Sequence, residues 1–150
     1  MQSATKIVAL SAVLLAMVLA YAGHADAQTP LPKPTLVYIV QEPFQTGGKQ
    51  WIRYRYYVAN ADAYPNQLFA ASPNLPPCGL NTSASRTWVD FFDKNGKRLN
   101  GFCALGNHND LNGIWFALES GVVPPSYVYI EMTDRQTKTK VKSNEADTTN

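Results

Sequence analysis

The chain has few of the residues that usually carry metal or nucleophilic chemistry. It contains two cysteines and two histidines, and His24 lies in a segment that we predict to be removed. It has no Gly-x-Ser-x-Gly nucleophile motif, and one remaining histidine with two paired cysteines does not make a zinc ligand set. We therefore expect no catalytic residue, no metal, no cofactor and no enzymatic activity.

Clustered positive charge is also missing. The formal net charge is +2, and removal of residues 1–27 leaves it unchanged because Lys6 and Asp26 are lost together. Nucleic-acid binding needs a basic face, so we expect no nucleic-acid partner. The basic segment 138–142 alternates as the outer face of an edge strand would, where lysines prevent pairing with other chains.

A long apolar stretch occurs at the start of the chain. Lys6, the apolar run 7–21 and the small residues of Ala25-Asp26-Ala27 form the pattern of a secretory signal peptide, with Ala20-Tyr21-Ala22 as an alternative cleavage site. The run is too short for a span of about 20 residues. We predict that residues 1–27 are a signal peptide, that the mature chain is periplasmic or secreted, and that it does not insert into the membrane.

The two cysteines lie on either side of the clearest strand-turn-strand pattern. The β-rich runs 86–93 and 98–103 flank Asn95-Gly96, a strong hairpin signal. In an exported chain, Cys78 and Cys103 are expected to form a disulfide. Closing a loop of about 25 residues stabilises a domain by roughly 3–4 kcal/mol.

Short strands with turn signals between them are predicted along the rest of the chain. Period-two alternation or apolar runs mark the segments 36–40, 51–60, 114–118, 127–133 and 138–143. Pro43 and Gly47-Gly48 mark a turn, and 68–70 is a short strand or a single helical turn. No segment has extended helical periodicity.

These patterns predict an all-β fold, an antiparallel two-sheet sandwich of six to eight strands. A small closed β-barrel is the alternative. The sandwich spans residues 36–144, preceded by an extended segment at 28–35 and followed by a disordered tail at 145–150.

Three motifs resemble those of small exported bacterial proteins, namely Leu75-Pro76-Pro77-Cys78-Gly79-Leu80-Asn81, Ala84-Ser85-Arg86-Thr87-Trp88-Val89 and Phe102-Cys103-Ala104-Leu105. The resemblance covers most of residues 36–144. It implies a shape similar to fibronectin type III-like or immunoglobulin-like sandwiches and no activity. The cysteines, 25 residues apart, are closer than the inter-sheet pair of antibody domains, and between them Trp88 is the candidate core tryptophan.

The strand 51–60 carries the candidate partner-binding residues. Its alternation places Ile52, Tyr54, Tyr56 and Val58 on one face and Trp51, Arg53, Arg55 and Tyr57 on the other. Aromatic rings interleaved with guanidinium groups can stack on sugar rings or peptide aromatics and donate hydrogen bonds. Alternatively, the stripe lies under a loop or pairs with acidic side chains of a neighbouring strand, such as Asp90 and Glu131.

The polar segment 106–113 carries a weaker candidate. Starting at His108, a calcium-loop template is matched by Asp110, Asn112, Gly113 and Glu119. Glu119, however, follows a predicted strand, and ordinary turn chemistry explains the other residues. We therefore expect His108 to be a solvated turn residue.

Two further patterns occur in the sequence. Asp90 and Glu131 could form a carboxylate pair on adjacent strands, but on a sheet face that offers no cleft. Asn81-Thr82-Ser83 matches a glycosylation sequon.

The sequence favours a non-catalytic exported binding or structural module of the cell envelope. It would use an outer sheet face for a protein or glycan partner. The alternatives are an envelope enzyme or inhibitor whose loops 73–85 and 106–113 form the site, and a weak calcium-binding module. A flat aromatic patch would favour binding, and a concave pocket with converging polar groups would favour an enzyme.

Overall fold

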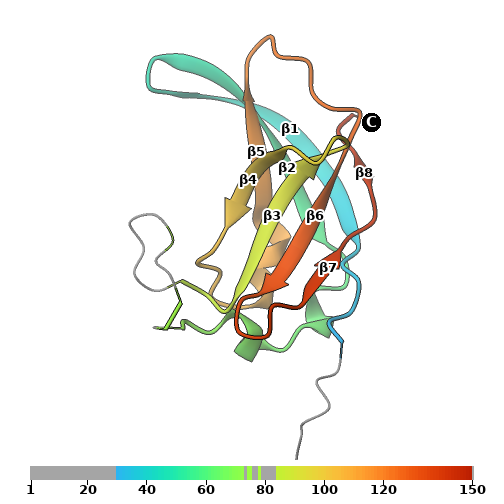
Figure 1. The fold of residues 1–150 in the computed structure, drawn as a ribbon. Coiled ribbons are helices and arrows are strands. Elements are labelled where there is room, and N and C mark those ends of the chain that lie inside the picture. The colour runs from blue at the N-terminus through green and yellow to red at the C-terminus, as the bar shows by residue number, and fades with distance from the viewer. Residues whose placement is uncertain (1–29, 73, 76–77, 79–83, 150) are drawn as a thin grey trace, which may run out of the picture. The chain divides into compact units, whose positions relative to one another are not determined.

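The computed structural model describes residues 30–72, 74–75, 78 and 84–149. Within them the chain is nearly all-β (Figure 1), with the strands β1 Leu36–Thr46, β2 Lys49–Val58, β3 Thr87–Asp93, β4 Arg98–Phe102, β5 Ile114–Glu119, β6 Tyr127–Asp134, β7 Lys140–Lys142 and β8 Ala146–Asp147. Three short 3-10 helices join them, η1 Ala61–Ala63, η2 Asn66–Phe69 and η3 His108–Gly113. The predicted signal peptide and the sequon at Asn81 lie outside the described residues.

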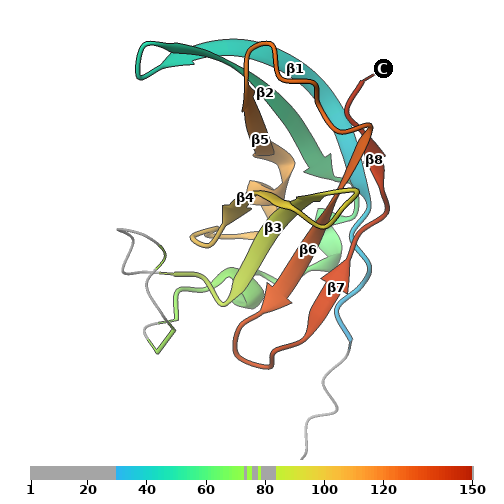
Figure 2. The same cartoon turned by 45° about the horizontal axis from the view of Figure 1, so that its top comes forward.

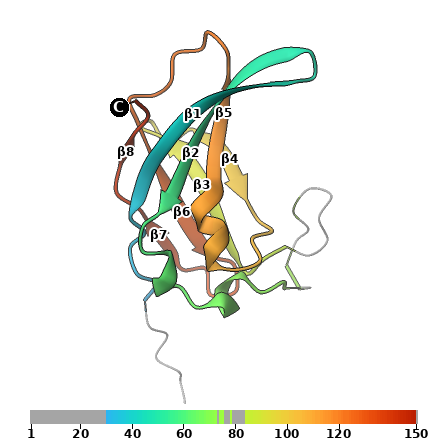
Figure 3. The ribbon, with the colours of Figure 1, turned by 180° about the vertical axis from the view of Figure 1, so that it is seen from behind.

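The strands form two antiparallel sheets that face each other. One has the order β1-β2-β5 and is in front in Figure 3; the other has the order β4-β3-β6-β7, with β8 also paired to β6, and is in front in Figure 1. No ladder joins the two sheets in the described part of the chain. The predicted sandwich is therefore confirmed, with eight strands in these residues, and the alternative barrel is not adopted.

Alternating apolar residues fill the space between the sheets, as the sequence pattern predicted. Tyr56 and Phe116 of the three-stranded sheet contact Phe91 of the other sheet, with ring centroids 5.4 and 5.8 Å away. These residues belong to one buried cluster with Tyr54, Val58, Val128, Ile130 and Met132. Fully burying one such side chain contributes roughly 1.5–3 kcal/mol, so this core is the main stabilising feature of the domain.

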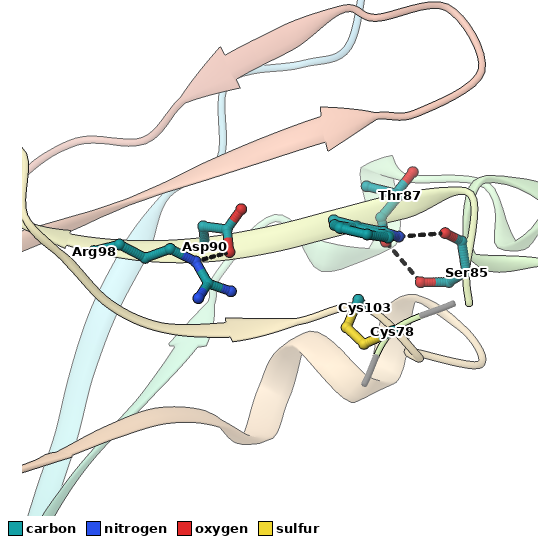
Figure 4. The surroundings of a disulfide bond; sticks show 7 residues. Cys78, Ser85, Thr87, Asp90, Arg98 and Cys103 are labelled. Atoms are coloured by element: carbon teal, nitrogen blue, oxygen red, sulfur yellow. Dashed lines mark hydrogen bonds and ion pairs between the residues drawn. A yellow bond between two sulfur atoms is a disulfide. The ribbon is translucent and has the colours of Figure 1, made fainter. Parts of the chain in front are cut away.

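The hairpin and its disulfide are as predicted. β3 and β4 pair in antiparallel fashion, and Gly96 in the turn has a φ of 79°, which glycine adopts without strain. Cys78 and Cys103 are bonded, with their Cα atoms 5.8 Å apart (Figure 4). The disulfide ties Cys103, just after β4, to the segment that precedes β3. A disulfide is typical of proteins that fold in an oxidising compartment.

Trp88 does not lie in the core, which corrects the sequence interpretation. On β3 the buried residues are Thr87, Val89 and Phe91, so Trp88 lies on the outer face. Its Nε1 donates to the carbonyl oxygen of Ser85 at 2.9 Å, and the guanidinium of Arg135 lies 4.3 Å from its ring centroid. The alternation allowed either face, and packing against the opposite sheet selected Val89 and Phe91.

The prediction of a turn at Pro43 is wrong, because β1 continues through it to Thr46. Pro43 lies opposite Ile52 of β2, and the turn is formed by Gly47 and Gly48, both with positive φ. Proline is tolerated here because β1 is an edge strand, where one side of the backbone needs no ladder partner. The β1–β2 hairpin extends past the end of its pairing with β5 (Figure 2).

The disordered tail predicted at 145–150 is also wrong for most of its length. Ala146 pairs with Val128 as part of β8, and Thr148 is buried. Just before it, the side chain of Asn144 accepts from the backbone nitrogen of Leu36 at 2.7 Å and donates to its carbonyl oxygen at 2.9 Å. A polar segment can thus be ordered by backbone pairing, which its composition does not reveal.

The structure also decides two smaller predictions. Residues 66–69 form η2, so the helical turn rather than the short strand is present. No helix among the described residues is long and apolar enough to cross a membrane.

Candidate functional site

The candidate site is the outer face of the three-stranded sheet, which we call the arginine face. The strand register places its residues in three rows across β1, β2 and β5, which are Val40, Arg55 and Trp115, then Glu42, Arg53 and Ala117, then Phe44, Trp51 and Glu119. Tyr57 extends the β2 stripe beyond these rows. The predicted grouping of Trp51, Arg53, Arg55 and Tyr57 is therefore what the register produces.

Arg53 lies at the centre of the arginine face, between two aromatic rings. Its guanidinium carbon is 4.6 Å from the Phe44 ring centroid and 4.7 Å from that of Trp115. The residue opposite it on β5 is Ala117, whose small side chain leaves room for this arrangement. Cation–π contact with two rings restricts the guanidinium, so its planar fork of donors is preorganised.

Glu42 is the acidic neighbour of both arginines. Its carboxylate oxygen Oε1 lies 3.7 Å from Nη1 of Arg53 and 3.7 Å from Nη1 of Arg55. These distances are too long for hydrogen bonds. The arginine face therefore contains two guanidinium groups that share one carboxylate without a close contact to it.

The other arginine pairs of the described residues are much tighter. Arg86 donates to Asp134 at 3.0 and 2.6 Å, and Arg98 donates to Asp90 at 2.6 Å. An arginine forms such short, charge-assisted hydrogen bonds when its carboxylate partner is well placed. The guanidinium groups of Arg53 and Arg55 form none with Glu42, so their N–H groups remain available to a partner.

Two donors of the arginine face are shielded from solvent and unsatisfied. Nε1 of Trp51 and Nε of Arg53 have no hydrogen-bond acceptor in the part of the chain that the structure describes. A buried donor without an acceptor costs roughly 1–3 kcal/mol. Both nitrogens lie below the surface, so the groups that a partner can reach directly are the exposed parts of the Arg53 and Arg55 side chains, 33% and 41% of each.

The acidic neighbour of the stripe is Glu42 on the adjacent strand β1; the partners named from the sequence, Asp90 and Glu131, are wrong because they are in the other sheet. Asp90 and Glu131 lie directly opposite each other on β3 and β6, as the carboxylate-pair hypothesis required. Asp90 pairs with Arg98, and Glu131 accepts from Nζ of Lys140 at 2.6 Å. Figure 4 shows the pair of Asp90 and Arg98. Gly101 lies opposite Asp90 on β4, and a Cβ at this position would overlap the Asp90 carboxylate and the Arg98 guanidinium. Glycine therefore leaves space for the ion pair. Each carboxylate is thus part of a surface ion pair.

The segment 106–113 contains the 3-10 helix η3, which has a capping box formed by Asn107 and Asp110, and is not an open turn. Asp110 Oδ2 accepts from the backbone nitrogens of Gly106 and Asn107, at 2.6 and 3.2 Å. His108 is half-buried, not solvated as predicted, and its Nε2 is 3.6 Å from Oδ1 of Asp62. The helix packs against β2 and η1, which shields part of the histidine from solvent.

The calcium template is not assembled in this geometry. Glu119 is the last residue of β5, and its carboxylate pairs with Nζ of Lys49 at 3.1 Å. Asp110 lies before the other end of β5, and its carboxylate accepts hydrogen bonds within η3 and the residues before it. A calcium site needs its carboxylates around one point. Within the described ranges, no group of three or more His, Cys, Asp or Glu residues is placed to hold a metal ion.

The alternative loop site is described only in part. Loop 106–113 is η3, while Pro73, 76–77 and 79–83 of the other loop lie outside the described residues.

Among the residues of the arginine face that the sequence interpretation missed, Glu42, Phe44 and Trp115 contact its arginines. Glu42 and Phe44 were assigned to the neighbourhood of a turn because of Pro43. The alternation of Val40, Glu42 and Phe44 continues across the proline and was the available signal. Trp115 alternates with buried Ile114 and Phe116 in the same way.

Comparisons of the chain with protein-family models, curated proteins and solved structures found no match. The fold and the arginine face therefore carry the functional argument by themselves.

Proposed function

We propose that the chain is an exported, non-catalytic binding module of the cell envelope, with the arginine face as its contact surface for a protein or glycan partner. The predicted signal peptide at residues 1–27 and the Cys78–Cys103 disulfide support a periplasmic or secreted location. Grouping the sandwich with fibronectin type III-like or immunoglobulin-like domains is part of the same proposal.

The observation that carries the proposal is the combination of aromatic rings and loosely paired guanidinium groups on one outer sheet face. Arg53 lies between Phe44 and Trp115, and the Nη1 atoms of Arg53 and Arg55 are each 3.7 Å from their shared carboxylate oxygen on Glu42. Tryptophan, tyrosine and arginine are the side chains most enriched at binding hot spots. A rigid sheet also presents them at little cost in conformational entropy.

The partner's chemistry follows from the same groups. The arginine face offers hydrogen-bond donors and flat apolar rings, with Arg55 exposing 41% of its side chain. It therefore suits a partner that presents carboxylates or hydroxyls beside apolar surface, as acidic protein segments and sugars do.

The test uses residues 28–150 in oxidised form, immobilised and exposed to envelope extract and to a glycan array. Variant Arg55→Glu reverses one charge at an exposed position, and Trp51→Ala removes a ring and a donor. We expect each to lower retention of the partner at least ten-fold, because 1.4 kcal/mol of lost contact corresponds to a factor of ten.

The matched control is Lys138→Glu, which makes the same charge change at an exposed turn of the other sheet. It should leave retention unchanged. Equal loss in Arg55→Glu and Lys138→Glu would indicate non-specific charge attraction. Binding that survives both face variants, with unchanged melting temperatures, would contradict the proposal.

A further inference from the structure

A separate cavity lies at one end of the sandwich, away from the arginine face. It is formed between the β3–β4 turn and the loop that joins β5 to β6, which lie at the same end of the domain (Figures 1 and 2). Its volume is about 210 Å³. The mouth of a β structure, where the two layers separate, is a common position for small-molecule sites.

One side of the cavity is apolar and the other is polar. Leu99 and Leu118 form part of it and also pack against the buried core, so the cavity opens onto the top of that core. Val122, Val123 and Pro125 of the β5–β6 loop complete the apolar lining. Val123 is 86% exposed, an unusual position for a large apolar side chain next to a cavity.

The polar part of the lining is cationic. Lys94 and Lys97 border the cavity, and neither forms an ion pair with any described residue, whereas Lys49, Lys140 and Lys142 each have a carboxylate within 4 Å.

Asp93 is the carboxylate of the same lining. It accepts from the backbone nitrogens of Asn95 and Lys97, at 2.8 and 2.9 Å, so it is engaged in the turn. These bonds direct the carboxylate into the turn but leave its charge in place, so two lysines and one aspartate give the lining a net charge of +1 beside the apolar side chains.

We propose that this cavity binds a short aliphatic carboxylate, with the chain between the leucine and valine side chains and the carboxylate at Lys94 and Lys97. The positive charge of Lys94 and Lys97 favours an anion, and the leucine and valine side chains favour a hydrocarbon tail. The volume is below the roughly 300–1,000 Å³ of pockets for drug-sized ligands, which limits the tail to a short one. The proposal does not depend on the arginine face.

The experiment titrates the oxidised chain, residues 28–150, with octanoate below its micelle concentration, by calorimetry and by amide and methyl NMR shifts. Octanol and octylammonium serve as neutral and cationic probes of the same length. We expect saturable one-site binding of octanoate, with shifts at Lys94, Lys97, Leu118 and Val123. Both other probes should bind at least ten-fold more weakly.

Two variants test the assignment of the groups. Lys94→Gln combined with Lys97→Gln should raise the Kd for octanoate about ten-fold and leave the Kd for octanol unchanged. Val123→Asp places a carboxylate in the wall at a site too exposed to affect folding, and should abolish octanoate binding. Val40→Asp makes the same substitution on the arginine face and should have no effect.

Several outcomes would overturn the proposal. These are no saturable heat or shift with octanoate, equal affinity for the three probes, or shifts that map to the arginine face. Sedimentation of the chain with anionic lipid vesicles, without binding of free octanoate, would show that the exposed valines and the lysines contact a membrane surface instead.

Discussion

The carboxylate of Asp134 and the guanidinium of Arg86 form a two-point contact, with Nε–Oδ1 and Nη2–Oδ2 distances of 3.0 and 2.6 Å. Asp134 ends β6 and pairs in register with Thr87, the first residue of β3. The same carboxylate accepts from the backbone nitrogens of Gln136 and Thr137. One side chain therefore joins the start of β3, the end of β6 and the turn that leads to β7.

Replacing Asp134 with asparagine should destabilise the domain by about 2–4 kcal/mol, because Arg86 is left without its carboxylate partner. Urea denaturation measures the loss. Arg86→Met in the Asp134→Asn background should cost little more than Asp134→Asn alone, since the two residues act as a pair. Additive losses would show that the contact contributes nothing by itself.

The pH dependence of stability should reflect the same carboxylate. Burial opposes ionisation of Asp134, but the hydrogen bonds from Arg86, Gln136 and Thr137 outweigh it and lower its pKa from 3.8 to about 2. The ionised form is therefore favoured in the folded state. Its contribution, about 2 kcal/mol, is fully present above pH 3.8 and lost as the pH falls from 3.8 to about 2. Acid unfolding curves should show this loss in the parent chain and not in Asp134→Asn.

At alkaline pH the buried tyrosines should limit stability. Burial raises the pKa of Tyr64 from 10.0 to about 12 and raises that of Tyr56 further. Because the unfolded chain ionises first, their contribution is present below pH 10 and lost as the pH rises above it. For Tyr64 the loss reaches about 2 kcal/mol near pH 12.

Phenolate absorbance and denaturation at each pH measure this effect together. In Tyr64→Phe the phenol that donates to the Pro32 carbonyl oxygen at 2.7 Å is absent, so the alkaline decline should be smaller. An identical decline in parent and variant would contradict the assignment to Tyr64.

Removal of the disulfide by Cys78→Ser with Cys103→Ser should lower the free energy of unfolding by roughly 3–4 kcal/mol, because the 25-residue separation is no longer closed in the unfolded chain. Adding reductant should lower the free energy of unfolding of the parent chain by the same amount and should leave that of the double variant unchanged. Two alkylatable thiols in the native purified protein would contradict the pairing.

Asn144 links the two sheets by bonding both backbone groups of Leu36, at 2.7 and 2.9 Å. Asn144→Ala should therefore destabilise the domain by about 1–3 kcal/mol and increase hydrogen exchange at the Leu36 amide. Asn112→Ala, at an exposed position of η3, is the matched control and should change stability by less than about 0.5 kcal/mol. Rapid exchange at Leu36 in the parent chain would contradict the contact.

Local patterns were enough to predict most of the strands. The alternation of Tyr54, Tyr56 and Val58 identified the buried face of β2, and Asn95-Gly96 located the β3–β4 hairpin. The stripe on β2 was likewise predicted as one face, since side-chain direction in a strand depends only on the period of two. The neighbouring residues Glu42 and Trp115 were not predicted to lie beside this stripe, because they belong to β1 and β5 and only the pairing of these strands with β2 brings them there.

The sequence by itself therefore determined the all-β class, the cysteine pair and the residues that share a face on each strand, because these depend on local periodicity and on the export that residues 1–27 predict. Only the tertiary structure decided which strands are neighbours. It placed Asp90 and Glu131 in the sheet opposite Arg53, turned Trp88 outward and ordered the segment after Asn144. The physical reason is that strand pairing and sheet packing are contacts between residues distant in the chain, and many arrangements satisfy the same local alternation.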